Sequence, residues 1–203
     1  TKTRYLQGQL VAQYAQDISK YAGKRAFEVR SIFDRIPVQL EDQGSHRFTV
    51  SSLGPGDRYS EYDQDFLWLV NAGVGLKVEQ VSEAKSPLKR TERPSMFKLY
   101  ESDTGMLMAR YPQSTARAVY LDMKDPNLGG LYENVVAQEL AALDIPAWYY
   151  QSKAVGEVDF LIEGKQGHVV PIEVKSGKKL RSHAALDNLL AVSEYKIPQG
   201  VVL

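Results

Sequence analysis

The chain has 203 residues, and 25 Lys and Arg residues balance 25 Asp and Glu residues, so its formal net charge is zero. Charged residues make up 25% and apolar residues 43% of the sequence, which excludes a disordered chain, a collagen-like fibre and a highly charged tail protein. The absence of cysteine excludes disulfide scaffolds, thiol nucleophiles, thiolate zinc sites and iron–sulfur sites. With only three histidines, a divalent metal is expected on carboxylates.

No apolar stretch reaches the ~18 residues that a membrane helix needs, and no signal peptide opens the chain. We therefore expect a cytoplasmic protein with no membrane partner. The first residue is Thr1 rather than Met, and residues 200–203 resemble a strand that is cut short. Both features predict that the sequence is a piece of a longer protein.

The first part of the chain is predicted to be mainly helical. Apolar residues at helical spacing predict helices over residues 4–22, 26–40 and 59–71, with a short extended piece at 46–50 and a strand at 74–81. Pro37 is expected to bend or end the second helix. This order of elements is that of a winged-helix domain, a variant of the helix-turn-helix.

The third predicted helix argues against ordinary DNA binding, because between Asp57 and Asn71 it carries four acids against one base. An acidic face repels phosphates. The same helix has four large apolar residues, which cannot all face one small core because a helix turns by about 100° per residue. They are Phe66, Trp68, Leu69 and Val70. We expect Trp68 to need cover from protein: the second domain, a lost part of the chain or a second copy.

Residues 83–95 are polar and contain two prolines, which predicts a linker between a winged-helix-like domain at 1–82 and a second domain at 96–203. In the second domain we expect a strand at 97–100, a helix near 103–110, an irregular stretch at 111–128, a helix at 129–143, strands at 147–151, 157–163 and 168–176, a helix at 181–195 and a strand from 201. Residues 164–167 are expected to turn a hairpin. The predicted fold class is α/β (α+β) with a mixed central sheet that is truncated at its C-terminus.

The candidate chemistry lies on that hairpin. Asp159 is on its first strand, together with Glu157, and Glu173 and Lys175 are two residues apart on its second strand. The apolar residues of the first strand are expected to share the face opposite the acids: Val158, Phe160 and Ile162. Two carboxylates brought side by side repel each other unless a cation lies between them, and Mg²⁺ or Mn²⁺ is the cation expected there.

Two further residues extend this hypothesis. A metal and Lys175 together can orient a water molecule, lower its pKa and stabilise a pentavalent phosphate. Glu133 lies on or beside the apolar face of the predicted helix 129–143, where a carboxylate is costly without a cation or a donor. An E-x-K triplet alone is weak evidence, because any half-exposed strand alternates charged and apolar residues. The hypothesis depends on the ordered set of a helix Glu, a strand Asp and the E-x-K of the next strand.

This ordered set resembles the PD-(D/E)xK nuclease superfamily, which has the restriction-endonuclease-like fold. Its strand acid corresponds to Asp159, its E-x-K to Glu173 and Lys175, and its helix acid to Glu133, whereas Val158 stands where the family often has proline. The resemblance implies that these four residues are catalytic. It also implies that Asp159, Glu173 and Glu133 bind Mg²⁺ or Mn²⁺.

Longer blocks resemble a large bacterial and archaeal family of AAA-type P-loop ATPases whose C-terminal half is a domain of unknown function. The segment from Phe97 to Leu107 is similar to its "K-x-Y-x-x-D-x-G-L" stretch, and the segment from Leu131 to Leu140 to its "L-F-E-N-x-V-x-x-E-L" stretch. The present sequence contains no Walker A motif, G-x-x-x-x-G-K-[ST]. The resemblance therefore implies that ATP binds only in an ATPase half that is absent from this sequence.

Lys178, Lys179 and Arg181 follow the E-x-K strand, where they could contact a phosphate backbone or simply form the solvated start of a helix. Three functions stay open. The first is a metal-dependent nuclease domain attached to an ATPase, and the second is a non-catalytic nuclease-like module that binds DNA or protein in an ATPase machine. The third, a winged-helix regulator with a ligand-sensing domain, is disfavoured by the acidic helix. The expected partners are nucleic acid, or a protein or second copy bound through the N-terminal domain.

Overall fold

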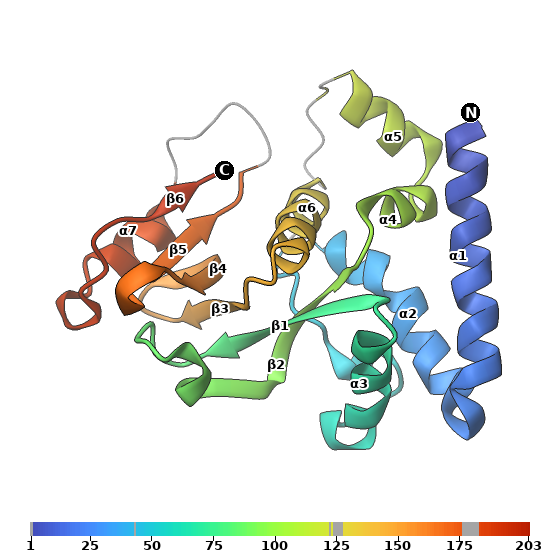
Figure 1. Cartoon of the computed structure of the whole chain (residues 1–203), viewed down its shortest axis with the longest axis horizontal. Coiled ribbons are helices and arrows are strands. Elements are labelled where there is room, and N and C mark those ends of the chain that lie inside the picture. The colour runs from blue at the N-terminus through green and yellow to red at the C-terminus, as the bar shows by residue number, and fades with distance from the viewer. Residues whose placement is uncertain (1, 43, 122, 124–127, 176–182) are drawn as a thin grey trace. The chain divides into compact units, whose positions relative to one another are not determined.

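The computed structural model describes residues 2–42, 44–121, 123, 128–175 and 183–203 (Figure 1). The chain divides into two compact units. Unit 1 comprises Thr1–Lys77 and Leu99–Gln138, and unit 2 comprises Val78–Lys98 and Glu139–Leu203. The described residues form seven α-helices and one six-stranded mixed sheet, so the predicted α/β class is confirmed.

Unit 1 contains the three N-terminal helices, α1 (Lys2–Tyr21), α2 (Ala26–Leu40) and α3 (Asp63–Asn71). Pro37 was expected to bend or end α2; it does not end the helix, which continues to Leu40 as predicted with Pro37 buried inside it. A proline lacks the N–H that would bond the carbonyl four residues earlier. That carbonyl, of Phe33, instead accepts a hydrogen bond of 2.7 Å from Arg110 Nη2, so a side chain replaces the missing backbone donor.

The region between α2 and α3 differs from the prediction. Residues 46–50 do not form a strand, because only Arg47 makes an isolated bridge there. The predicted third helix is split into a 3₁₀ turn, Tyr59–Glu61, and α3, which begins at Asp63. Trp68 is half-buried and lines a hollow with Tyr14 and Tyr21 of α1, whereas Leu67 is 49% exposed. Trp68 is thus only partly covered within unit 1, and Leu67 is the most exposed of the large apolar residues of α3.

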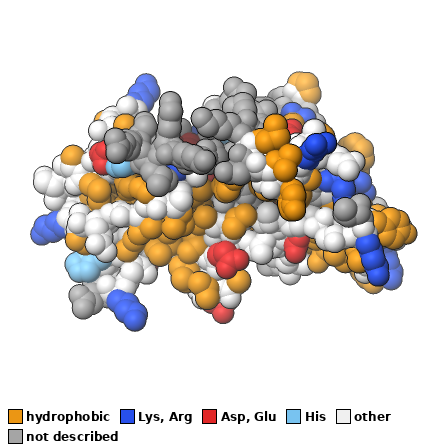
Figure 2. Space-filling model, turned by 90° about the horizontal axis from the view of Figure 1, so that it is seen from above, with side chains coloured by type: hydrophobic (Ala, Val, Ile, Leu, Met, Phe, Trp, Pro, Cys, Tyr) orange, Lys and Arg blue, Asp and Glu red, His pale blue; other side chains and the backbone are white. Residues whose placement is uncertain are grey.

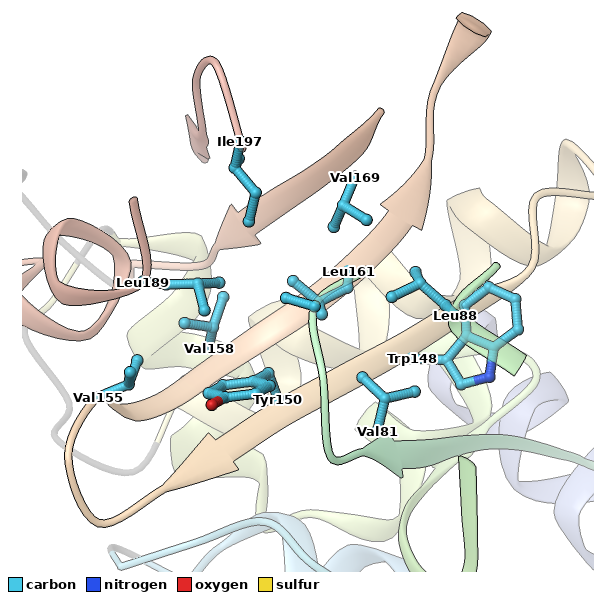
Figure 3. Close-up of a cluster of buried hydrophobic side chains, with 11 residues drawn as sticks. Val81, Leu88, Trp148, Tyr150, Val155, Val158, Leu161, Val169, Leu189 and Ile197 are labelled. Carbon is cyan, nitrogen blue, oxygen red and sulfur yellow. The ribbon is translucent and has the colours of Figure 1, made fainter. Parts of the chain in front are cut away.

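The stretch at 83–95 is not a linker, because two of its residues, Ala84 and Leu88, are fully buried in the hydrophobic cluster of unit 2. Figure 3 shows Leu88 beside Trp148 in that cluster. Glu163 anchors the same stretch by accepting hydrogen bonds of 2.8 Å from Ser86 Oγ and Leu88 N. The polar composition predicted that this stretch would be exposed. The two buried apolar side chains and the hydrogen bonds to Glu163 instead hold it against unit 2.

The sheet has the strand order β2-β1-β3-β4-β5-β6. Its strands are β1 (Gly75–Val81), β2 (Glu92–Glu101), β3 (Ala147–Ser152), β4 (Gly156–Glu163), β5 (Val169–Glu173) and β6 (Val201–Val202). β1 is parallel to β3 and β5 is parallel to β6, while β3, β4 and β5 are antiparallel. The predicted turn at 164–167 joins β4 to β5, and the N–H of Gly164 donates to the carbonyl of His168 at 2.8 Å.

A register shift interrupts the pairing of β3 with β4. Trp148 lies opposite Leu161, whereas Tyr150 lies opposite Val158, so β4 has one extra residue in this interval. Such a bulge breaks the alternation of side chains between the two faces of a strand. Val158 and Leu161 consequently lie in the same hydrophobic cluster (Figure 3). The prediction that Val158 shares a face with Phe160 and Ile162 is therefore wrong at Val158.

The remaining helices are α4 (Thr104–Arg110), α5 (Gln113–Tyr120), α6 (Gly129–Ala142) and α7 (Ala184–Leu190). The predicted irregular stretch at 111–128 is wrong over α5, a helix that buries none of its residues. Leu186 and Leu189 of α7 are buried. No helix within the described ranges is long and apolar enough to cross a membrane.

Gly130 of α6 packs directly against the end of α2 within unit 1. A Cβ at this position would overlap the backbone carbonyl of Leu40, so Gly130→Ala forces the helices apart. We expect this variant to lower the free energy of unfolding by at least about 2 kcal/mol in urea titration. Gly8→Ala is the control, because nothing lies within 4 Å of the added methyl group in α1. It should stabilise the protein by up to about 1 kcal/mol. Equal effects would contradict the close contact of α6 with α2.

Candidate functional site

A buried lysine lies at the centre of the acidic cluster in unit 2. Lys98 of β2 is fully buried, and its Nζ lies 2.7 Å from Glu157 Oε1 and 3.5 Å from Asp159 Oδ1. The ammonium also lies over the ring of Tyr149, 5.4 Å from the ring centroid. Both acids are on β4, which is separated from β2 by β1 and β3 in the sheet order. The lysine side chain therefore carries its charge past Tyr149 of β3 to the acids of β4.

Asp159 is also tied to the end of β5. Its Oδ2 accepts a hydrogen bond of 2.8 Å from the N–H of Val174, the residue that follows Glu173. The ladder between the two strands is regular up to the pair Phe160 and Ile172. The hairpin therefore brings the carboxylate of Asp159 to the strand that bears the E-x-K triplet, and Asp159 is only 9% exposed there.

Glu173 and Lys175 form the second charged pair of unit 2. Lys175 Nζ donates to Glu173 Oε1 at 2.6 Å, and the lysine side chain is 28% exposed, whereas that of Glu173 is 8% exposed. The other oxygen of Glu173, Oε2, is buried and has no hydrogen-bond partner among the described residues. A buried acceptor without a donor destabilises a fold. A cation or a water molecule beside Oε2 would remove that cost.

Glu133 belongs to unit 1, where it lies on α6 and is 6% exposed. Its Oε1 is 2.8 Å from His46 Nδ1, and its Oε2 accepts a hydrogen bond of 2.7 Å from the hydroxyl of Tyr100. The sequence predicted that a carboxylate at this position needs a cation or a donor. Within unit 1, two donors from distant segments meet this requirement.

The next residue of α6 fastens this helix to the end of β2. Asn134 Oδ1 accepts from the N–H of Glu101 at 2.8 Å, and Nδ2 donates to the carbonyl of Glu101 at 2.9 Å and to Thr104 Oγ1 at 3.1 Å. Asn134 thus binds both backbone groups of Glu101, as a neighbouring strand would. This double hydrogen bond sets the rotation of α6 and with it the position of Glu133.

Glu101 itself is buried beside Arg110, whose Nη1 donates to Glu101 Oε2 at 3.1 Å. Burial raises the pKa of the Glu101 carboxyl to about 7, and the nearby charge of Arg110 opposes that rise. The guanidinium lies over the ring of Phe33, 4.1 Å from the centroid, and Arg110 also donates to the Phe33 carbonyl. Arg110 therefore links the end of β2 to α2.

The remaining predicted site residues fall outside this geometry. Lys178, Lys179 and Arg181 lie outside the described residues. Among the residues that the structure describes, no three His, Asp or Glu side chains gather as a metal-binding group. Within unit 2, Asp159 and Glu173 are each accompanied by a lysine. One or two carboxylates with several retained waters is the ligand set that Mg²⁺ uses, so the donor atoms present fit a hard divalent cation.

Sequence reasoning missed Lys98, Tyr100 and His46. A signal for Lys98 was present, because a single lysine interrupts the apolar run from Met96 to Tyr100. Lysine is almost never fully buried unless it is paired, so a lysine inside a buried strand predicts a buried acid. The run did not reveal which acid, since Asp159 is 61 residues away in sequence.

Comparison with known families covers most of the chain. The profile of a domain of unknown function, DUF8612, matches residues 1–117, which is more than half of the sequence. The chain belongs to the DUF8612 family. The profile of a second domain of unknown function, DUF4143, matches residues 128–203. No curated protein and no solved structure matches the chain.

The acidic cluster of unit 2 is built from residues of both family segments. Lys98 falls in the segment that matches DUF8612, and its partners Glu157 and Asp159 fall in the segment that matches DUF4143. Glu133, Glu173 and Lys175 also belong to the DUF4143 segment. Neither segment alone contains the full set of charges around Asp159.

Asn134→Ala should be among the most destabilising single changes in the DUF8612 chain. The variant leaves the N–H and carbonyl of Glu101 without their side-chain partner in a buried position. Each lost buried hydrogen bond costs about 1–2 kcal/mol, so we expect a loss of about 2–4 kcal/mol in chemical denaturation. Val135→Ala is the control, since Val135 is the next residue of α6 and is 41% exposed. A loss below that of Val135→Ala would contradict the proposed role of Asn134.

Glu101 should make stability depend on pH. Its folded-state pKa of about 7 exceeds the ordinary 4.5, so the folded state holds a proton that the unfolded state releases. The stabilisation is complete below about pH 4.5 and disappears as the pH rises through 7, a change of about 3 kcal/mol. Besides Arg110, the charges acting on Glu101 are those of Asp103 and Asp34. Urea midpoints at pH 5 and pH 8 should therefore differ more in the natural protein than in Glu101→Gln. Equal differences would show that Glu101 titrates normally.

Proposed function

We propose that the DUF8612 chain contains a metal-dependent nuclease site of the PD-(D/E)xK type that hydrolyses nucleic-acid phosphodiesters. One observation carries the proposal: the carboxylate of Asp159 reaches the strand that bears Glu173 and Lys175 and binds the N–H of Val174. The acid of one strand and the E-x-K of the next are thus adjacent in unit 2. This is the arrangement that the resemblance to the nuclease superfamily implies.

The donor atoms suit a hard divalent cation. Glu173 Oε2 is buried without a hydrogen-bond partner in the described ranges, and the carboxylate of Asp159 lies at the end of the same strand. Asp159 and Glu173 would hold Mg²⁺ or Mn²⁺ together with retained waters. When bound, the cation supplies Lewis acidity and lowers the pKa of a coordinated water.

The residues of the chain account for the rest of the proposed chemistry. Lys175 is the partly exposed cation of the pair, and its ammonium can orient a water or stabilise negative charge on the phosphate. Lys98 holds Asp159 from the buried side. Glu133 is assigned to the reaction by the resemblance, and His46 and Tyr100 fix the direction of its carboxylate within unit 1.

The proposal extends to partners. DUF4143 is typically associated with ATPase-containing proteins, which supports an AAA-type ATPase with its own ATP site in the whole protein. Several apolar side chains of unit 1 are exposed, among them Tyr5 at 66%, Tyr21 at 62% and Phe27 at 82%. Figure 2 shows hydrophobic side chains exposed at the surface. These exposed residues favour a protein partner for the N-terminal segment, with nucleic acid as the substrate of unit 2.

A non-catalytic nuclease-like module is the second candidate. One observation favours it: both acids already have a lysine partner, Lys98 for Asp159 and Lys175 for Glu173. A site whose acids are neutralised internally could bind DNA or protein without cleaving it. Activity measurements separate the two functions.

We expect Mn²⁺- or Mg²⁺-dependent cleavage of at least one substrate in a panel of single- and double-stranded DNA and RNA. Asp159→Asn and Lys175→Met should each reduce the rate at least about 100-fold, because each removes a group that acts on the metal or on the phosphate. Lys153→Met, at an exposed lysine in the turn between β3 and β4, is the control and should leave the rate unchanged. Cleavage that survives both active-site changes, or its absence on all substrates, would reject the nuclease in favour of the binding module.

A further inference from the structure

Lys98 occupies a position that a metal ion could otherwise take. Its ammonium lies between two carboxylates, 2.7 Å from Glu157 and 3.5 Å from Asp159. Without a cation, two acids at this spacing would repel each other and attract a divalent ion. The ammonium is a compact point charge with three donors, so it can bridge the two carboxylates as a small cation does.

The lysine cannot exchange as a metal ion does. Its side chain is 0% exposed, and its strand neighbours Phe97 and Leu99 are buried at 0% and 1%. The side chains of Glu157 and Asp159, in contrast, keep 20% and 13% of their surface accessible. The ammonium therefore holds the acids from inside the fold, and they stay reachable from solvent.

We propose that Lys98 is a resident cation of the acidic cluster, standing where a second metal ion would stand, so that the site takes one divalent cation and not two. This inference rests on the proposed nuclease function and deepens it. Two-metal sites place two ions about 3.5–4 Å apart on shared carboxylates. Here one of the two positive charges is covalently part of β2, and only the solvent-facing position is left for Mg²⁺ or Mn²⁺.

The charges around the site support a single ion. Lys98 offsets part of the negative charge of Glu157 and Asp159 and occupies the position between them, so this pair attracts a further cation less strongly than two carboxylates without an ammonium would. On β5, Lys175 pairs with Glu173 in the same way. Replacing Lys98 by a neutral residue would leave Glu157 and Asp159 without this ammonium and open a place for another ion.

Calorimetric titration with Mn²⁺ tests the proposal through the number of ions bound. The natural chain should bind one Mn²⁺, and Lys98→Met should bind a second one. Glu157→Gln preserves the size of the side chain but removes one negative charge, so it should weaken Mn²⁺ binding about tenfold or more. Lys85→Met is the matched control, because Lys85 is a partly exposed lysine that pairs with Glu194 at 3.0 Å, away from the acidic cluster, and it should leave both quantities unchanged.

Thermal unfolding gives a second measurement that does not depend on activity. Lys98→Met should melt about 10 °C lower without metal, because it removes the buried ammonium that pairs with Glu157 and Asp159. Saturating Mn²⁺ should restore most of that loss in Lys98→Met, but not in the double variant Lys98→Met with Glu157→Gln. If Lys98→Met does not fold without metal, the affinity of Glu157→Gln for Mn²⁺ decides whether the cluster around Lys98 takes part in metal binding.

The outcomes separate this inference from the function on which it rests. If the natural chain binds one Mn²⁺ while Lys98→Met gains no ion and Glu157→Gln keeps its affinity, Lys98 has only a structural role and the nuclease proposal stands. If the natural chain binds two ions, the inference about Lys98 is also wrong, and the nuclease proposal again stands. If the natural chain binds no Mn²⁺ at millimolar concentration, both the metal-dependent nuclease and the role of Lys98 fail together.

Discussion

A charge that leaves water must meet a partner inside the protein, and this requirement organises the chain around strand β2. Three of the last four residues of this strand have polar side chains, and each of them has a partner in another element. Lys98 meets the acids of β4 in unit 2. In unit 1, Tyr100 donates to Glu133, and Glu101 binds Arg110. The strand runs from one unit into the other, and it supplies polar partners to both.

Arg110 shows how one buried ion pair supports a local irregularity elsewhere. A proline inside a helix leaves one carbonyl without its donor, and here that carbonyl belongs to Phe33. Arg110 can supply the donor only because Glu101 and the Phe33 ring hold its guanidinium in place. Arg110, which lies far from α2 in sequence, thus completes the hydrogen bonding of the helix, and α2 can contain Pro37.

Local patterns predicted the parts of this protein that depend on near neighbours in sequence. The helices α2 and α6 and the hairpin of β4 and β5 follow from apolar spacing and from the turn at 164–167, and that hairpin brings Asp159 to the E-x-K strand. The partners of the acids could not be predicted in the same way, because His46 is 87 residues from Glu133 and Lys98 is 61 residues from Asp159. Tertiary packing determines such pairs, and periodicity contains no information about them. The bulge in β4 could not be predicted for a related reason, because it depends on how β4 pairs with β3.

The internal lysines have a consequence for the proposed substrate. Around the site in unit 2, two lysines, Lys98 and Lys175, pair with three acids, Glu157, Asp159 and Glu173. Carboxylates repel a phosphodiester, and each internal ammonium lowers that repulsion. A bound divalent cation lowers it further and favours phosphate binding, whereas without Lys98 the same cation would have one more negative charge to offset. On the proposed function, a fixed ammonium therefore lets a single metal ion both complete the chemistry and admit the substrate, so that metal binding and nucleic-acid binding are coupled by charge alone.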